Sequence, residues 1–183
     1  FSDRFYRVLA EFPRLTVLSK FPAAIPHATR CEIKTTGEPV YQRPRPLSGV
    51  KLAAMKTEFE TLLKLGIVRR SRSAWASPLH VVPKADGQFR PCGDYRRLNA
   101  ITEPDRYPLP LLTDFAGNLA GCSVFSKIDL VKGYHQIPVR PSDVPKTAVT
   151  TPFGCFEYLR MPFGLKNAAQ TFQRVVDNVT QGL

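Results

Sequence analysis

The sequence lacks the long apolar runs that a membrane protein needs. No stretch of its 183 residues approaches the roughly 18 consecutive apolar residues that a membrane-spanning helix requires. Charges at Arg4, Arg7 and Glu11 also interrupt any apolar segment of a secretory signal near the start. We therefore expect no membrane partner. Because the first residue is Phe1 rather than methionine, we expect the chain to be a piece of a longer protein.

Cysteine is scarce and dispersed. The four cysteines lie about 30 or more residues apart, so none forms the C-x-x-C pairs of zinc sites and redox centres. They are Cys31, Cys92, Cys122 and Cys155. We expect reduced thiols in a cytosolic environment, and neither a disulfide nor a structural metal.

Acidic residues are few relative to basic ones. The chain has 15 Asp and Glu against 26 Lys and Arg, a net charge of +11 at neutral pH. Residues 64–97 hold eight basic and two acidic residues, so +6 of that charge lies in 34 positions. Such a patch suits phosphate backbones or triphosphates, and a solvated basic face is the alternative that charge alone leaves open.

Periodicity in the first half predicts an α+β chain. The prolines of residues 1–47 favour an extended, wrapping segment. A helix follows, with Ser48 as its cap and Gly66 at its end. Its apolar residues recur at spacings of three and four, namely Leu52, Met55, Phe59, Leu62 and Leu63. The apolar runs 79–83 and 89–92 flank an Asp-Gly pair and predict a hairpin.

The second half predicts shorter elements. Proline spacing favours a short helix that runs through Leu119 and ends at Gly121. The final helix is expected to begin after Asn167, with an apolar stripe along one side. Strands are expected at residues 123–129, 136–139, 146–151 and 155–160, the first of them buried.

Asp129 is the most informative single residue. It ends the apolar segment Phe125–Asp129, and a turn closed by Gly133 and Tyr134 follows it. An acid in that position can hold a metal ion at the edge of a sheet. Taken alone, however, such an aspartate is more often a turn residue or a helix cap.

The segment Phe125–Gln136 closely resembles the first catalytic motif of reverse transcriptases from gypsy-type (Ty3-like) LTR retrotransposons. Other segments resemble further motifs of that family in the same order. Residues 73–78 resemble the entry into the fingers sheet, and residues 90–99 the fingers motif. Residues 151–154 and 161–168 resemble the template-grip motif and its helix. Together these motifs cover most of the chain from about residue 40 onward.

The resemblance implies a fold and a division into domains. Residues 48–122 would be mainly fingers, and residues 123–183 the first half of a palm. The palm would be a split βαβ, ferredoxin-like sheet, cut before its Tyr-x-Asp-Asp hairpin. Residues 1–47 would form an extended connector that wraps these parts.

The same resemblance implies an RNA-directed DNA polymerase, a nucleotidyltransferase that uses two Mg²⁺ ions. Asp129 would be the catalytic carboxylate and a metal ligand, with the Leu130 carbonyl beside it. Lys84 and Arg90 would clamp the triphosphate of the incoming nucleotide. Tyr134 would be the steric gate against a ribose 2′-hydroxyl, with an ordinary core tyrosine as the alternative.

Partners also follow from the resemblance. Gly164 would let the backbone approach the template, and His80 would contact a template base or be an exposed strand histidine. The partners would be an RNA template, a DNA or RNA primer and deoxynucleotide triphosphates. The rest of the palm, a thumb and a ribonuclease H domain would come from the same polyprotein, in a cytoplasmic virus-like particle.

The sequence departs from the family pattern at three points. No two acids are adjacent, so the Tyr-x-Asp-Asp pair is absent and we expect no polymerisation by this chain alone. Ala169 stands where the family has proline, and Gly93 where a branched apolar residue is usual. The alternatives are a non-catalytic nucleic-acid-binding relic and a fragment that only contacts proteins.

Overall fold

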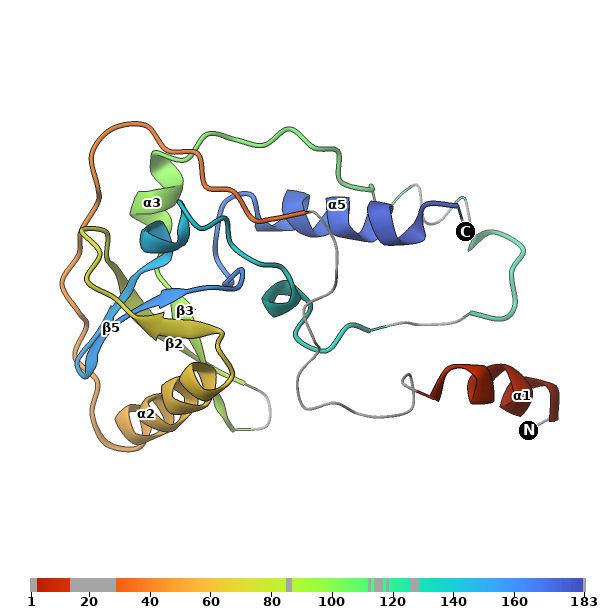
Figure 1. Cartoon of the computed structure of the whole chain (residues 1–183), viewed down its shortest axis with the longest axis horizontal. Helices are drawn as coiled ribbons and strands as arrows, with labels where there is room; N and C mark the ends of the chain where they lie inside the picture. The colour runs from red at the N-terminus through yellow and green to blue at the C-terminus, as the bar shows by residue number, and fades with distance from the viewer. Residues whose placement is uncertain are drawn as a thin grey trace.

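A five-stranded sheet forms the centre of the molecule (Figure 1). The computed structural model describes residues 3–13, 29–84, 87–111, 113, 117, 119–125 and 129–182. The strands lie in the order β1 (Val68–Arg70), β5 (Gly154–Tyr158), β4 (Val149–Thr151), β2 (Ser77–Pro83) and β3 (Phe89–Gly93). Strands β2 and β4 pair in parallel, and the other three pairs of neighbouring strands in this sheet are antiparallel. With helices packed beside this mixed sheet, the α+β prediction is confirmed.

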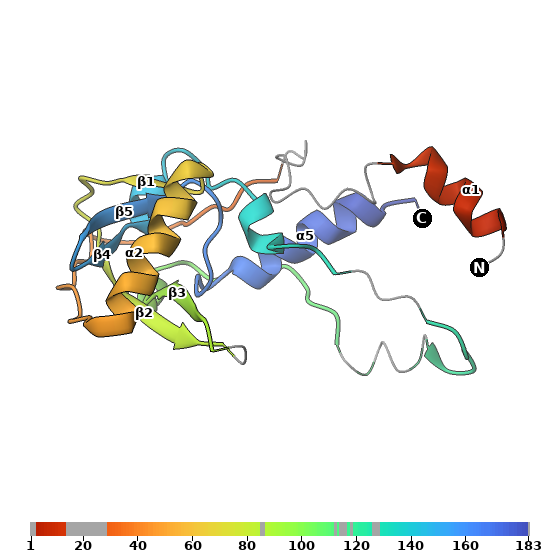
Figure 2. The same cartoon turned by 90° about the horizontal axis from the view of Figure 1, so that it is seen from below.

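Helix α2 (Gly49–Lys64) packs against β1 and β3 (Figure 2). Its buried residues are Met55, Phe59 and Leu62, which the apolar spacing predicted. The Phe59 ring lies 4.8 Å from that of Phe156 on β5, which joins the helix to the sheet. Ser48 occupies the N-cap position without a side-chain cap hydrogen bond, and Gly66 has φ +64 at the end. The helix and its limits were therefore predicted correctly.

The predicted hairpin is also confirmed. Strands β2 and β3 pair in antiparallel register from Leu79 with Gly93 to Pro83 with Phe89. Lys84 and Arg90 lie near its tip, and residues 85–86 are outside the described part of the chain. The helix expected through Leu119 falls largely on residues 112–118, most of which are also outside it.

The wrapping segment joins distant parts of the fold. Residues 29–47 run mostly extended and make isolated bridges with Val139, Thr102 and Ala76. Helix α1 (Asp3–Glu11) was not predicted, and it lies away from the sheet in both views (Figures 1 and 2). The apolar spacing Phe5, Val8, Leu9, Phe12 is the sequence signal that could have found it.

Short 3₁₀ helices occupy the first residues of two predicted strands, of which one is absent and the other begins later than expected. The helix η2 (Gly133–Gln136) precedes isolated bridges at Pro138 and Val139, so the strand at 136–139 was wrong. The helix η3 (Val144–Thr147) precedes β4. In η3, Pro145 has no amide hydrogen to give to a sheet, which favours the turn. The Thr147 hydroxyl instead accepts the amide of Tyr158 at 2.8 Å.

The buried strand expected at 123–129 was wrong for the residues that can be seen. Residues 123–125 form no strand, and the side chains of Val124 and Phe125 are 86% and 60% exposed. Residues 126–128 are outside the described part. A strand needs a paired neighbour, and none of β1 to β5 pairs with residues 123–125. The described residues thus contain only part of the predicted palm.

The start of helix α5 (Ala168–Thr180) is bound to the loop that follows the short helix α3 (Arg96–Ala100). Asn167 stands at the N-cap of α5 but makes no side-chain cap bond there. Its amide group instead donates to the Glu103 carbonyl at 2.8 Å and accepts the Asp105 amide at 3.1 Å. The helix start was predicted correctly, whereas the role of Asn167 is to anchor the loop after α3.

The sheet takes strands from both sides of the expected boundary at residues 122 and 123, so that division of the chain stays a prediction. None of the four cysteines, all of which lie in the described part of the chain, is placed in a disulfide. Among the helices of the described residues, none is long and apolar enough to cross a membrane.

Candidate functional site

A cavity of about 420 Å³ lies beside the β2–β3 hairpin. Lys84 and Arg90 line it from the hairpin, as their predicted shared role requires. Lys132 and His135 line it from the segment that follows Asp129. The structure therefore brings the two predicted phosphate-binding residues together, and adds a lysine and a histidine.

Three side chains stack in a row at this cavity. The Arg90 guanidinium lies 5.3 Å from the centre of the Phe163 ring. On Phe163, in turn, the ring of Tyr134 is stacked at 5.1 Å with an interplanar angle of 30°. Phe172 of α5 lies 5.4 Å from Tyr134. Phe163 therefore connects the predicted triphosphate clamp to the predicted steric gate through contacts that hold both side chains in place.

His135 is the neutral member of the cavity wall. Burial, together with the nearby charge of Lys132, lowers the pKa of His135 to about 4. Its Nδ1 atom is buried and has no hydrogen-bond partner within the described residues. At neutral pH the positive charge of the cavity therefore comes from Lys84, Arg90 and Lys132, with Glu58 as an acid in its lining.

Asp129 and Leu130 precede the cavity-lining residue Lys132 in the sequence, and both are exposed. Neither lines the cavity. The loop that follows them is fixed by Gln136, whose amide donates to the Val131 carbonyl at 2.9 Å. Asp129 thus belongs to the same short segment of chain as Lys132, which lines the cavity, and Tyr134.

The described residues do not complete a metal site. No group of three His, Cys, Asp or Glu side chains that could hold an ion occurs among them. Asp129 supplies a single carboxylate, and two divalent ions need several anionic ligands between them. The donors seen here therefore fit one corner of a two-metal centre and not the whole of it.

Gly164 lies where two motifs touch. It has φ +93, and a Cβ at this position would come within 3.3 Å of the Gly93 carbonyl oxygen. Its own carbonyl accepts a 2.8 Å hydrogen bond from the Asn99 amide group. The left-handed backbone and the close contact both require glycine. The observed contact is with the fingers motif, and contact with a template stays a prediction.

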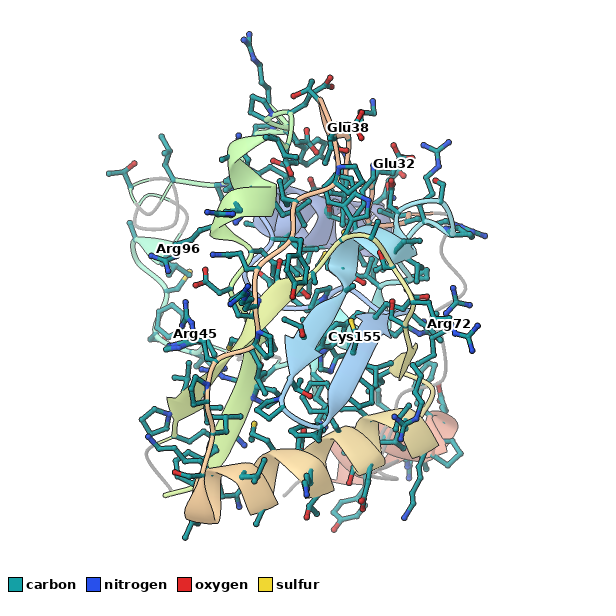
Figure 3. The ribbon with its side chains drawn as sticks, turned by 90° about the vertical axis from the view of Figure 1, so that its left-hand side faces the viewer. Glu32, Glu38, Arg45, Arg72, Arg96 and Cys155 are labelled. Atoms are coloured by element: carbon teal, nitrogen blue, oxygen red, sulfur yellow. The ribbon has the colours of Figure 1, made fainter. Side chains whose placement is uncertain are left out.

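His80 lines a second hollow, of about 330 Å³, with Arg45, Gly93, Asp94 and Arg96. Asp94 is almost buried and accepts hydrogen bonds from both arginines, including Arg96 Nε at 2.8 Å. The hydrogen bond from Arg96, supported by the charge of Arg45, lowers the pKa of Asp94 to about 2. Figure 3 shows Arg45 and Arg96 on the same side of the molecule. One ionised aspartate therefore holds two arginines at the surface.

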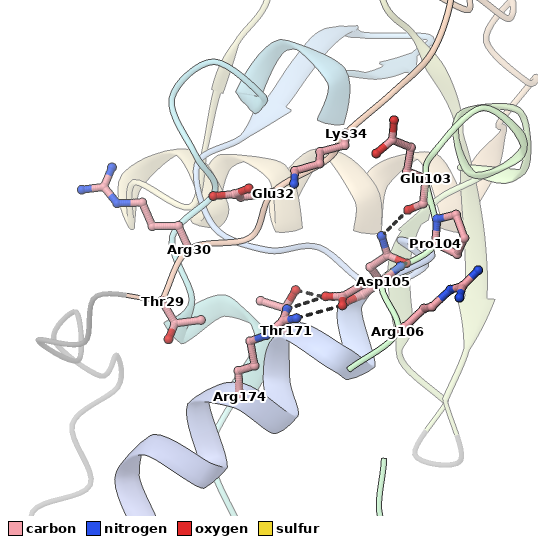
Figure 4. Close-up of a pocket in the computed structure, with 11 residues that line it drawn as sticks. Thr29, Arg30, Glu32, Lys34, Glu103, Pro104, Asp105, Arg106, Thr171 and Arg174 are labelled. Carbon is pink, nitrogen blue, oxygen red and sulfur yellow. Dashed lines mark hydrogen bonds and ion pairs between the residues drawn. The ribbon is translucent and has the colours of Figure 1, made fainter. Parts of the chain in front are cut away.

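A hollow of about 580 Å³ on another side contains none of the predicted site residues (Figure 4). Its wall joins residues 29–34, the loop 103–106 and α5. Arg174 binds both carboxylate oxygens of Asp105, one of them at 2.8 Å. Acids and bases alternate around this hollow, so it has no charge of one sign to offer a ligand.

Sequence reasoning missed the residues that are close only in space. Phe163 belongs to a motif that was assigned to template contact. Lys132 and His135 belong to a segment in which only Asp129, Leu130 and Tyr134 were assigned a role. Arg45 lies in the segment that was interpreted as a connector. Aromatic and basic residues that flank each motif were the only available signal, and their convergence depends on the fold.

Comparison with known proteins gives a consistent result. Residues 82–183 match the family model of the reverse transcriptase (RNA-dependent DNA polymerase). The chain is 38% identical over 178 residues to the retrovirus-related Pol polyprotein from transposon opus of Drosophila melanogaster, covering 94% of the chain. It is 43% identical over 154 residues to that from transposon 297 of the same species, covering 81% of the chain. It spans only 18% and 14% of these relatives.

Solved structures agree on the fold. The foamy viral protease-reverse transcriptase in complex with an RNA/DNA hybrid superposes with a TM-score of 0.81 at 19% identity. That match covers the whole chain and 25% of the viral protein. The prototype foamy virus protease-reverse transcriptase gives 0.78 at 22% identity, over 96% of the chain and 24% of the viral protein.

Proposed function

Because the chain belongs to the reverse transcriptase (RNA-dependent DNA polymerase) family, we propose that it contributes fingers and part of the palm to an RNA-directed DNA polymerase. Its relatives are transposon polyproteins, so we place it within the polyprotein of an LTR retrotransposon. The rest of the palm, the thumb and a ribonuclease H domain would be its covalent partners. Four free cysteines fit a reducing, cytoplasmic virus-like particle.

The observation that carries this proposal is the cavity beside the β2–β3 hairpin. Lys84 and Arg90 line it together, and the stack of Arg90, Phe163 and Tyr134 continues its wall. Fixed cations of this kind offset the charge that develops on a triphosphate during nucleotidyl transfer. Deoxynucleotide triphosphates are therefore the proposed substrates, with the Tyr134 ring packed where a 2′-hydroxyl would lie.

The nucleic-acid partner is supported by charge and by structural likeness. Arg45 and Arg96 stand at the surface beside His80, and guanidinium groups bind phosphate oxygens in bidentate geometry. The foamy viral enzyme was solved with an RNA/DNA hybrid. We propose an RNA template and a DNA or RNA primer, with His80 and Gly164 on the template side.

Members of this family use divalent metal ions, and we propose Mg²⁺ here. Asp129 and the Leu130 carbonyl would hold one side of the metal centre, and further carboxylates must come from elsewhere in the polyprotein. Bound ions would activate the primer hydroxyl and neutralise the triphosphate. Within this chain the work is to bind and orient the phosphates and to position the sugar.

The proposal is tested at two lengths. We expect the chain alone to bind an RNA–DNA hybrid with an affinity that falls as salt rises, and to extend no primer in magnesium. In a longer polyprotein that contains this chain, Asp129→Asn should abolish primer extension, whereas Asp177→Asn, on α5, should retain it. Extension by the chain alone, or by the Asp129→Asn polyprotein, would contradict the proposal.

The steric gate has a separate test in the same longer protein. Tyr134→Ala opens the space between Phe163 and Phe172, so we expect ribonucleotides to be incorporated. Tyr134→Phe keeps the stacked ring and should still exclude them. Primer extension with deoxynucleotides alone and with ribonucleotides alone measures the ratio of the two incorporation rates. If this ratio is unchanged in Tyr134→Ala, Tyr134 is not the steric gate.

A further inference from the structure

We propose that Lys132 is a third triphosphate-binding residue, reaching the phosphates from the palm side while Lys84 and Arg90 reach them from the fingers hairpin. The inference rests on the proposed function and adds a residue to it. From the sequence, the triphosphate clamp was assigned to the hairpin pair, Lys84 and Arg90. The structure assigns Lys132 to the same cavity.

The backbone of Lys132 is unusual. With φ 49 and ψ 45 it is left-handed, and it is the only non-glycine residue of the described part with a positive φ. Lysine gains nothing from this conformation, which costs on the order of 1 kcal/mol for a residue with a Cβ. Strain of this kind persists where the surrounding structure imposes it, often at a functional site.

The surrounding contacts fix the strained loop from both sides. The Gln136 amide group holds the Val131 carbonyl at 2.9 Å, and the His135 amide donates to the Lys132 carbonyl at 2.8 Å. A Cβ at the following Gly133 would lie 3.0 Å from the Phe172 ring, so the loop packs closely against α5 at this point. The backbone that carries Lys132 is therefore held in place, which lowers the entropy that ordering the loop would cost on binding.

The charge of the cavity matches a polyanion. Among the described residues, three cations, Lys84, Arg90 and Lys132, line it against the one acid Glu58, a net charge of +2 with His135 neutral. The cations come from two separate segments, so a ligand with several charged groups in a row could contact all three. A triphosphate has this form, whereas a single phosphate could satisfy only part of the set.

The test measures binding of inorganic tripolyphosphate and of deoxythymidine triphosphate to the whole chain by calorimetry, without metal. Lys132→Asn removes the charge while asparagine tolerates the left-handed backbone, so the fold should be kept. We expect affinity to fall about tenfold, the size of one charge-assisted hydrogen bond. Lys132→Arg should retain most of the affinity, and the matched control Lys56→Asn, on the exposed side of α2, should retain all of it.

The outcomes separate this inference from the proposed function. If the unchanged chain binds tripolyphosphate and Lys84→Ala weakens binding while Lys132→Asn does not, the inference about Lys132 is wrong and the proposed function stands. If the unchanged chain binds neither ligand, both are overturned. If Lys132 has only a structural role, Lys132→Asn should lower the melting temperature of the chain. In that case Lys132→Arg should also fail to restore affinity, even where its melting temperature is unchanged.

Discussion

His135 shows how one residue can set the behaviour of its surroundings in acid. Its imidazole packs near the rings of Tyr158 and Phe163, and its pKa in the folded chain is about 4. In the unfolded chain the pKa returns to its ordinary value near 6.5. The unfolded state therefore binds more protons between these values, and stability must fall as the pH drops through that range.

We predict that His135→Phe removes this loss. The unchanged chain should lose about 1–2 kcal/mol of unfolding free energy between pH 7 and pH 5, whereas the variant should lose clearly less. Urea denaturation at the two pH values measures the difference. Equal losses in the two proteins would show that the histidine is protonated in the folded chain.

Gly93, the departure from the family pattern in the fingers motif, has a structural reason. A Cβ at this position would lie 2.5 Å from two ring atoms of Tyr95. Tyr95 is 1% exposed, and its hydroxyl donates to the Thr147 carbonyl at 2.9 Å, so the ring cannot move aside. The absence of a side chain at Gly93 thus makes room for the ring of Tyr95.

Gly93→Ala should therefore destabilise the chain by about 1–3 kcal/mol through overpacking. The matched control is Gly117→Ala, since a Cβ there meets nothing within 4 Å. Thermal unfolding compares the two. A Gly93→Ala protein as stable as the control would mean that the Tyr95 ring has another place to go.

At the scale of elements, a clasp joins the loop after α3 to helix α5. Arg174 binds the Asp105 carboxylate and lies 4.4 Å from the centre of the Tyr107 ring. The Tyr107 hydroxyl in turn donates to Asp177 at 2.6 Å. The hydrogen bonds from Arg174 lower the pKa of Asp105, which keeps the pair charged. Three contacts thus fix the chain just before the segment that leads to Asp129.

A double-mutant cycle measures this clasp. With Asp105→Asn and Arg174→Gln we expect a coupling energy of about 1 kcal/mol, since the pair is partly exposed and screened by water. The control cycle uses Glu32 and Arg140, a more exposed pair at 3.4 Å, and should give a value near zero. Equal couplings would show that the bidentate geometry adds nothing.

The elements that could be predicted from the sequence are those that a pattern within their own residues specifies. The apolar spacing around Phe59 produced α2, and the Asp-Gly pair produced the hairpin. Strand β1 was missed because two of its three residues are exposed arginines, and only its pairing with β5 makes it a strand. The strand expected at 136–139 shows the converse, since its apolar residues are buried by loops and a 3₁₀ helix.

At the candidate site, too, contacts that a single motif marks could be predicted, and contacts between distant segments could not. Lys84 and Arg90 could be predicted because a family motif marks them, and they do meet at one cavity. The stacking of Phe163 between Arg90 and Tyr134 could not, because it joins three segments that are distant in sequence. No pattern within one segment specifies which ring will lie against which cation.

At the scale of the whole molecule, apolar side chains stay uncovered around Asp129. Val124, Phe125 and Val131 are 86%, 60% and 55% exposed, and Leu130 is exposed beside them. Exposed apolar residues so close in sequence favour association between molecules. We therefore expect the isolated chain to self-associate through this segment.

We predict that Val124→Ser with Phe125→Ser reduces self-association of the chain without lowering its melting temperature. Sedimentation velocity over a range of concentrations measures the first, and thermal unfolding the second. The control changes Val50 to Ser, a 76% exposed valine on α2 remote from this segment. If only the control, or neither protein, associates less, the segment around Asp129 is not the cause.

The order of strands in the sheet also governs how the chain assembles during synthesis. Strands β2 and β3 are neighbours in sequence and can pair as soon as both leave the ribosome. Strand β1 must wait, since Arg69 bonds to Glu157, 88 residues later. Until β5 is made, Val68 and Phe59 have no strand to cover them, and closing so long a loop is slow. The nascent chain therefore holds a formed hairpin and an open sheet until translation has passed residue 158.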